Sequence, residues 1–154
     1  MKSLPAFKII FFVICLLLIT SNSIAAEKMT DRWHITGYTK YRDAVFVDIS
    51  RLTFPTPGTV TIWVKIAPAG KSGYFRLVNE YLASVNKSDK GFKSIEILCE
   101  INCSGHLIRF SRFMYFDASG NVIHAVDETN PQRYLIEQGN PWYNVEKEAC
   151  AEKK

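Results

Sequence analysis

The feature that most constrains this chain is an alternation of apolar and other residues that recurs between turn residues. It is clearest at 59–66, where every second position is β-branched and apolar: Val60, Ile62, Val64 and Ile66. A two-residue period places these side chains on one face of a strand and their neighbours on the other. Further strands are predicted at 33–38, 45–49, 94–103, 107–116 and 122–126. Their short connections favour antiparallel pairing.

One stretch changes to a helical period. Between 74 and 85 the apolar residues recur every three or four positions, as Tyr74, Leu77, Val78, Tyr81, Leu82 and Val85. This spacing predicts an amphipathic helix that covers one face of the sheet. A short helix is also expected around 145–151. The predicted fold class is therefore mainly β (α+β), with a single antiparallel sheet of about five to seven strands and one helix packed on a face.

The N-terminal segment has the order of a secretory signal peptide. Lys2 and Lys8 precede an unbroken apolar run of 11 residues at 9–19, and small residues follow. That run is too short for a membrane span, which needs about 20 residues. Cleavage is expected after Ala25 or Ala26, which divides the chain into a signal peptide at 1–25 and one domain at 26–154. Cys15 lies inside the apolar run, so no lipid anchor is expected.

The charge of the mature chain is close to balance. The sequence has 19 basic and 15 acidic residues, and cleavage removes two lysines, which leaves a net charge of +2. This does not favour nucleic acid, which usually needs a concentrated basic face. Lys87, Lys90 and Lys93 form a loose basic group, as do Lys40 and Arg42. Each group is either a solvated face or a patch for an anionic ligand such as a glycosaminoglycan.

Three cysteines remain after cleavage, in a compartment where disulfides persist. Cys99 and Cys103 lie in one predicted strand, about 13 Å apart, which is too far for a bond between them. Either of them can therefore pair with Cys150. The third thiol is left free or forms a bond between two molecules.

The sequence contains no convincing catalytic constellation. It lacks a phosphate-binding glycine loop, a nucleophile elbow and a Cys-x-x-Cys pair, and its three histidines are scattered. Cys99 shares a face with Ile97 and Ile101, so it is expected to be a buried, inert thiol. Asp43 and Asp48 are expected to be solvated acids at strand ends. We therefore predict no enzyme activity, no cofactor and no metal site.

Trp63 is the aromatic residue with the clearest alternative roles. It shares a strand face with Thr61 and Lys65, opposite the apolar face of the same strand. If the helix packs on the apolar face, Trp63 is free to lie at the surface, where tryptophan often anchors an interface. If it does not, Trp63 belongs to the core, as most aromatic residues do.

An ordered set of short motifs resembles the surface-adhesin protein E family of small exported bacterial proteins. The match runs through nearly all of the mature chain. Its elements are Trp33, Asp48-Ile49-Ser50, Val60-Thr61-Ile62-Trp63-Val64-Lys65, Glu100-Ile101-Asn102-Cys103, Arg109, Ser111, Tyr115-Phe116-Asp117 leading to Gly120, and a final cysteine, Cys150.

The resemblance implies an antiparallel sheet with a packed helix and a disulfide between Cys103 and Cys150, with Cys99 as an additional free thiol. It also implies a non-catalytic binder of host matrix proteins such as vitronectin and laminin. The best-known member is lipid-anchored to the outer membrane, whereas this chain lacks a lipidation cysteine.

The expected function is an exported binding module for extracellular matrix proteins or anionic glycans, located in the periplasm or at the cell surface. Candidate contacts are Trp63, Lys65, Lys87, Lys90 and Lys93. The alternative is a periplasmic structural or accessory protein of unknown role that has no host ligand. The expected partners are extracellular matrix proteins or envelope proteins. The chain is expected to be a monomer, or a dimer joined through Cys99.

Overall fold

In the computed structural model, residues 32–87 and 91–151 are described. The predicted signal peptide at 1–25 and the candidate contact Lys90 lie outside these ranges. The strands are β1 (His34–Tyr38), β2 (Ala44–Thr56), β3 (Thr59–Ala67), β4 (Phe92–Asn102), β5 (Leu107–Asp117), β6 (Val122–Asp127) and β7 (Arg133–Leu135). The helices are α3 (Gly73–Ser84) and α4 (Pro141–Ala151). No helix in these ranges has the length and apolar character needed to cross a membrane.

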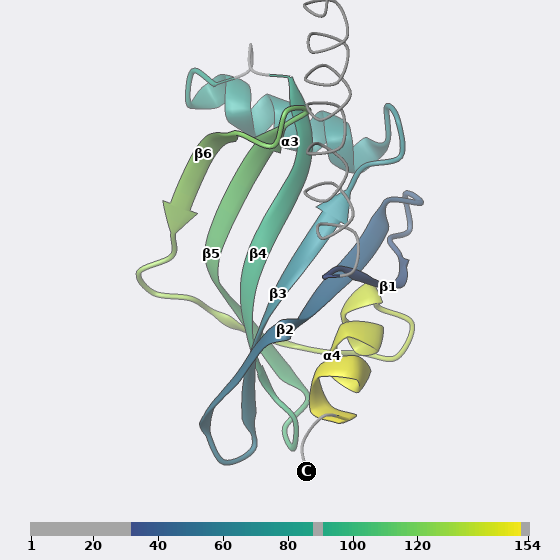
Figure 1. The fold of residues 1–154 in the computed structure, drawn as a ribbon, viewed down its shortest axis with the longest axis vertical. Helices are drawn as coiled ribbons and strands as arrows, with labels where there is room; N and C mark the ends of the chain where they lie inside the picture. The colour runs from purple at the N-terminus through teal and green to yellow at the C-terminus, as the bar shows by residue number, and fades with distance from the viewer. Residues whose placement is uncertain (1–31, 88–90, 152–154) are drawn as a thin grey trace, which may run out of the picture. The chain divides into compact units, whose positions relative to one another are not determined.

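The strands form one antiparallel sheet, which confirms the predicted fold class. Six strands lie side by side in chain order, β1 to β6, because each is joined to the next by a hairpin or by the α3 connection. The seventh, β7, was not predicted. It pairs with the start of β5 through Leu107–Leu135 and neighbouring residues, beyond the end of β6. Figure 1 shows β6 beside β5 at this edge of the sheet, and the register of β5 shows that its outer edge is shared between β6 and β7.

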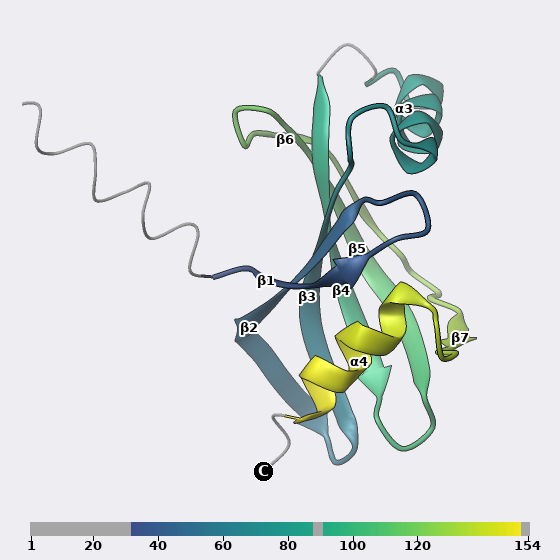
Figure 2. The ribbon, with the colours of Figure 1, turned by 90° about the vertical axis from the view of Figure 1, so that its right-hand side faces the viewer.

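Both helices cover the same face of the sheet (Figure 2). Helix α3 lies at the end where β4 begins, and it buries Val78 and Leu82. Helix α4 lies toward the other end, contacts β1, β2 and β3, and buries Val145 and Ala149. The strand side chains beneath them are the apolar set predicted from the alternation, including the fully buried Val60, Ile62 and Val64.

Helix α4 begins four residues before the predicted start of the C-terminal helix. Pro141 occupies its first position, where a missing N–H costs nothing. The side chain of Asn140 accepts a hydrogen bond from the backbone N–H of Trp142, at 3.1 Å. These two residues start the helix at Pro141 and place the Trp142 ring on the sheet.

The opposite face of the sheet carries neither helix, and we refer to it as the helix-free face. Its side chains come from the alternate positions of the same strands. Asp48, Trp63, Leu98, Arg112 and Asp127 are successive cross-strand partners from β2 to β6, so they form one row across it.

Candidate functional site

Trp63 and Lys65 lie on the helix-free face, near its middle. Their strand, β3, alternates regularly between fully buried and half-buried residues. Both side chains belong to the half-buried set, so neither is enclosed in the core nor fully open to solvent. The helices pack on the other face, which is the condition under which the sequence placed Trp63 near the surface.

Two cations stack on the tryptophans of this face. The guanidinium of Arg51 lies 4.8 Å from the centre of the Trp63 ring and 5.9 Å from that of Trp33. The ammonium of Lys65 lies 5.6 Å from the centre of the Trp33 ring. Each contact of this kind contributes about 0.5–2 kcal/mol, depending on how dry the site is. We call Trp33, Asp48, Arg51, Trp63 and Lys65 the cation–aromatic cluster.

Asp48 is buried at the base of the cluster. Its carboxylate accepts hydrogen bonds from Nε of Arg51 and from the hydroxyl of Ser50, each at 2.5 Å. A second nitrogen of Arg51 lies 3.7 Å from the carboxylate of Glu96 and makes no hydrogen bond. Because a buried carboxylate is costly without partners, Asp48 fixes the guanidinium that stacks on the tryptophans.

The prediction that Asp43 and Asp48 are solvated was wrong, since both are completely buried. Asp43 accepts hydrogen bonds from the hydroxyl of Thr39 at 2.6 Å and from the backbone N–H of Ala69 at 3.1 Å. These partners are distant in sequence or lie in a turn. The alternation pattern could not show that the two acids are satisfied inside the protein.

A strand irregularity brings Arg51 to the same side as Asp48. Residues three apart in a regular strand point to opposite faces. Here the pairing of β2 with β3 shifts between Asp48 and Thr53, where five positions of β2 run opposite two of β3, so three extra residues enter β2. Such a bulge re-aims the side chains around it. This irregularity explains why the alternation pattern did not predict Arg51 beside Trp63.

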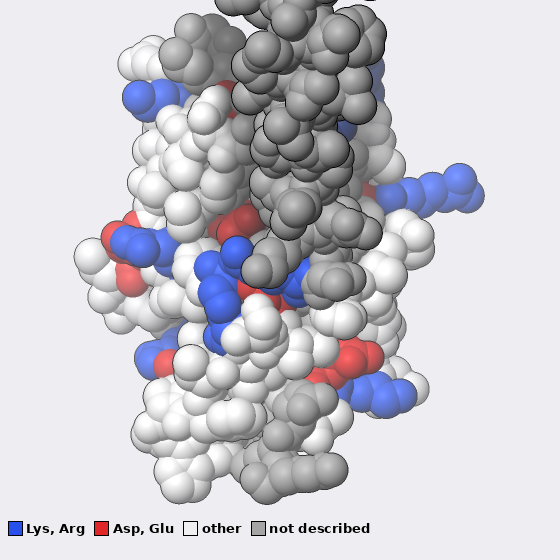
Figure 3. Space-filling view, viewed as in Figure 1, with Lys and Arg blue, Asp and Glu red and all other residues white. Residues whose placement is uncertain are grey.

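The rest of the helix-free face has paired charges of both signs. Arg109 donates a hydrogen bond to Glu100 at 2.6 Å, and Arg112 donates two to Asp127, at 2.6 and 2.9 Å. The hydrogen bonds from Arg112 hold the pKa of Asp127 below its ordinary value. Figure 3 shows basic and acidic side chains intermingled over β3 and β4. The helix-free face is thus mixed in charge, and no single sign dominates it.

Lys87 and Lys93, unlike Lys65, do not join this cluster. Lys87 follows α3 and Lys93 lies near the start of β4, on either side of the segment that contains Lys90. Trp63 is the cross-strand partner of Leu98, five residues beyond Lys93. Five residues of strand span about 17 Å. Trp63 and the loop lysines are therefore separate candidate surfaces.

A hollow of about 580 Å³ lies on the helix-bearing side, and the sequence analysis missed it. Lys40 and Asn140 line part of this hollow. Its other walls are mainly aromatic and are formed by Tyr38, Tyr41, Tyr74 and Trp142. They come from the β1–β2 turn, the first turn of α3 and the first turn of α4. Only the fold brings these three segments together. We call this the aromatic hollow.

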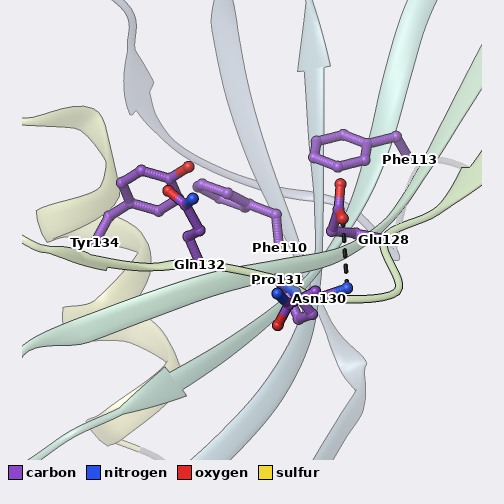
Figure 4. A pocket seen from close by; sticks show the side chains of 7 residues that line it. All are labelled: Phe110, Phe113, Glu128, Asn130, Pro131, Gln132 and Tyr134. Atoms are coloured by element: carbon purple, nitrogen blue, oxygen red, sulfur yellow. Dashed lines mark hydrogen bonds between the residues drawn. The ribbon is translucent and has the colours of Figure 1, made fainter.

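A second hollow of about 290 Å³ lies where the edge of the sheet passes from β6 to β7. Figure 4 shows Phe110, Phe113 and Tyr134 on one side of it, with Glu128 and Pro131 from the connecting segment. The ring of Phe110 lies 4.9 Å from that of Trp142, centre to centre. This ring pair stands between the second hollow and the aromatic hollow.

The structure contains the disulfide that the resemblance implied. Cys103, just after β4, is bonded to Cys150 near the end of α4. Cys99 is free and completely buried in the core. Burial raises the pKa of its thiol, so it stays protonated. A bond between two molecules through Cys99 would require the core to open.

The histidines take part in structural contacts. Nδ1 of His106 lies 2.9 Å from the carboxylate of Glu146, and His124 stacks on Tyr115 with ring centres 5.9 Å apart. Burial, together with the Tyr81 hydroxyl, raises the pKa of Tyr115 to about 12. Within residues 32–87 and 91–151, no three side chains of His, Cys, Asp or Glu are arranged to hold a metal ion.

Solved structures of protein E from Haemophilus influenzae share this fold. One superposes with a TM-score of 0.53 at 13% identity, covering 78% of this chain and 84% of that one. Its selenomethionine form gives 0.52 at 12% identity, covering 79% and 87%. Protein E from a non-typeable strain gives 0.51 at 14% identity, covering 75% and 76%. The resemblance to protein E is therefore confirmed at the level of the fold.

No family model matches the sequence, and no curated protein does.

Proposed function

We propose that this protein is an exported, non-catalytic binding module whose contact surface is the helix-free face. The cation–aromatic cluster would be the centre of that surface. Stacked Trp63 and Arg51 are of the residue types that dominate the energy of protein–protein interfaces. The proposal includes export through the signal peptide at 1–25, with the mature domain beginning near residue 26.

The observation that carries this proposal is the fixed position of Arg51. Its guanidinium is bonded to a fully buried carboxylate, yet the side chain remains 37% exposed between two tryptophans. The Arg51 side chain is therefore already held in one conformation before a partner binds. Preorganised contacts of this kind cost less conformational entropy on binding than mobile ones.

The mixed charge of the helix-free face favours a folded protein as the partner. A polyanion would meet Glu96, Glu100 and Asp127 as well as the basic residues. We therefore propose an extracellular matrix protein as the ligand of this face, in line with the family resemblance. Lys87, Lys90 and Lys93 are kept as a separate candidate surface for an anionic glycan.

The binding test compares matched variants on immobilised vitronectin and laminin. Trp63→Ala and Lys65→Glu should each weaken binding roughly tenfold, as expected for residues at the centre of an interface. Leu77→Ala is the control, because Leu77 is 54% exposed on α3, on the other side of the sheet. Thermal melting of each variant checks that it is folded. Equal binding by all folded variants would reject the helix-free face as the contact surface.

The alternative is a periplasmic accessory protein that has no host ligand. Protease treatment of intact cells separates the two cases, with a known periplasmic protein as control. Digestion of this protein while the control survives supports a surface location. Protection until the outer envelope is breached would favour the periplasmic role.

A further inference from the structure

One wall of the aromatic hollow is formed by a hydrogen-bonded turn. The β1–β2 turn is closed by hydrogen bonds between the backbones of Thr39 and Asp43 and of Arg42 and Thr39, each at 2.9 Å. The Thr39 hydroxyl is bonded in turn to the buried carboxylate of Asp43. The Tyr41 ring lies against Gly73, where a Cβ atom would come within 2.9 Å of it. The wall formed by Tyr41 is thus set by the packing of the turn on α3.

The polar groups that face the hollow include three tyrosine hydroxyls and one indole N–H, each of which can donate a hydrogen bond. Within the described parts of the chain, the hydroxyls of Tyr38, Tyr41 and Tyr74 and the indole N–H of Trp142 make no hydrogen bond. Burial raises the pKa of Tyr74, so its hydroxyl keeps its proton. Two side-chain acceptors nearby are already used, because the Thr39 hydroxyl accepts from the backbone N–H groups of Tyr41 and Asp43 and the Asn140 carbonyl accepts from that of Trp142.

A polyproline II segment has the complementary chemistry. Proline has no backbone N–H, and this extended helix has no internal hydrogen bonds, so its backbone offers carbonyl acceptors only. Aromatic-lined grooves bind such segments in several families of recognition domain. The tyrosine hydroxyls and the indole N–H of the hollow can all donate to such carbonyls.

The path of such a segment can be traced beyond the aromatic hollow. The contact between Trp142 and Phe110 continues the aromatic surface toward the second hollow, where Tyr134 lies 5.8 Å from Phe110. The two hollows differ in charge, since Lys40 lines the first and Glu128 lines the second. An acidic residue would suit the Lys40 end of the path and a basic residue the Glu128 end.

We propose that this track binds a proline-rich segment in the polyproline II conformation, with acidic and basic residues at its opposite ends. The track runs from Tyr38 and Tyr41 over Trp142 and Phe110 to Tyr134. It lies on the helix-bearing side, so it is a site distinct from the cation–aromatic cluster. Binding at the track can therefore be confirmed or rejected independently of binding at the cation–aromatic cluster.

The test measures fluorescence anisotropy of a labelled peptide of about eight prolines, a length that forms this helix, with aspartates at one end and arginines at the other. Tyr38→Ala and Tyr41→Ala should each weaken binding roughly tenfold, as for aromatic anchors. Phe54→Ala is the matched control, because Phe54 is 50% exposed on β2, outside both hollows, and this variant should bind within about twofold of the wild type.

A second peptide keeps the charged ends and replaces the prolines with glycine and serine. It should bind at least roughly tenfold more weakly, because it must lose the freedom that proline has already removed. Equal binding of the two peptides, or no saturable binding by the folded wild type, would overturn the proposal. Binding of heparin or neutral oligosaccharides in place of the proline peptide, lost in Tyr41→Ala, would overturn it in favour of a glycan site.

Discussion

The carboxylate of Glu146, on α4, lies 2.9 Å from Nδ1 of His106, in the turn between β4 and β5. Glu146 is buried, whereas His106 is largely exposed and has a left-handed backbone, with φ of 51°. Asparagine tolerates this conformation better than most residues and can also donate a hydrogen bond. The contact joins the C-terminal helix to the sheet beside the Cys103–Cys150 bond.

His106→Ala should lower the free energy of unfolding by about 1–3 kcal/mol, because it leaves a buried carboxylate without this donor. His106→Asn should cost less, since it can keep both the donor and the backbone conformation. Urea unfolding measures both values. Glu148→Gln, at an exposed position of α4, controls for a general effect of charge on the helix. Equal losses for the two His106 variants would show that the contact with Glu146 contributes little.

The disulfide holds the C-terminal end of α4, beyond the contact made by Glu146, so loss of the disulfide should release that end. The bond closes a loop of 47 residues. Cys103→Ser or Cys150→Ser should destabilise the fold by about 2–5 kcal/mol. Cys99→Ala should cost about 1 kcal/mol, because it removes only one buried sulfur atom. Thermal melting without reductant compares the three variants, and a larger effect at Cys99 would contradict this ranking.

The cation–aromatic cluster predicts a coupled pair of substitutions. Arg51→Met should destabilise the fold by about 2–3 kcal/mol, because Asp48 loses its guanidinium while it stays buried. Asp48→Asn combined with Arg51→Met should lose less than the sum of the two single changes. A double-mutant cycle by chemical denaturation measures this coupling. Strict additivity would mean that the two groups do not stabilise each other.

The alternation of apolar residues predicted the fold well because one face of every long strand is buried. Such a face forces a two-residue period over 59–66 and 94–101, and the structure has β3 and β4 there. Strand β7 has only three residues, all exposed, so no buried face leaves a pattern to detect. Its pairing with β5 depends on where the chain runs after β6.

The candidate site was only partly predictable. Trp63 and Lys65 were singled out because they lie opposite a buried strand face, which is a local property. The contribution of Arg51 depends on a bulge, and that of Trp33 depends on how β1 joins β2. The aromatic hollow combines three segments that approach one another only when both helices pack on one face. Contacts that depend on a bulge, on strand pairing or on helix packing leave no periodic pattern in the sequence.

The pair formed by Arg112 and Asp127 predicts a pH dependence. The folded pKa of Asp127 is lowered by the hydrogen bonds from Arg112, so the ionised form stabilises the folded state. That contribution is fully present above about pH 5 and is lost as the pH falls through the folded pKa, below 3.8. Asp127→Asn should therefore melt at a lower temperature than the wild type at pH 7, and the difference should shrink as the pH falls below 3.8. A difference that is constant with pH would contradict the assignment.

Gly73 offers a way to move one wall of the aromatic hollow without unfolding the protein. A Cβ atom at this position would lie 2.9 Å from the Tyr41 ring, at the flexible end of a side chain that is 40% exposed. The ring can swing away, and alanine also favours the helix that begins here. Gly73→Ala should thus change the free energy of unfolding by less than about 1 kcal/mol.

The same substitution should weaken binding of the proline-rich peptide several-fold, because the ring and hydroxyl of Tyr41 are moved away from the positions where they would contact the peptide. Gly91→Ala is unsuitable as a control, because the backbone there has φ of 68° and alanine would be strained. Ala83→Gly is suitable, since it alters the exposed end of α3 away from the hollow. Peptide anisotropy and urea unfolding on both variants separate the two effects. Unchanged peptide affinity in Gly73→Ala, with the Tyr41 ring displaced in a crystal structure, would show that Tyr41 is not part of the binding track.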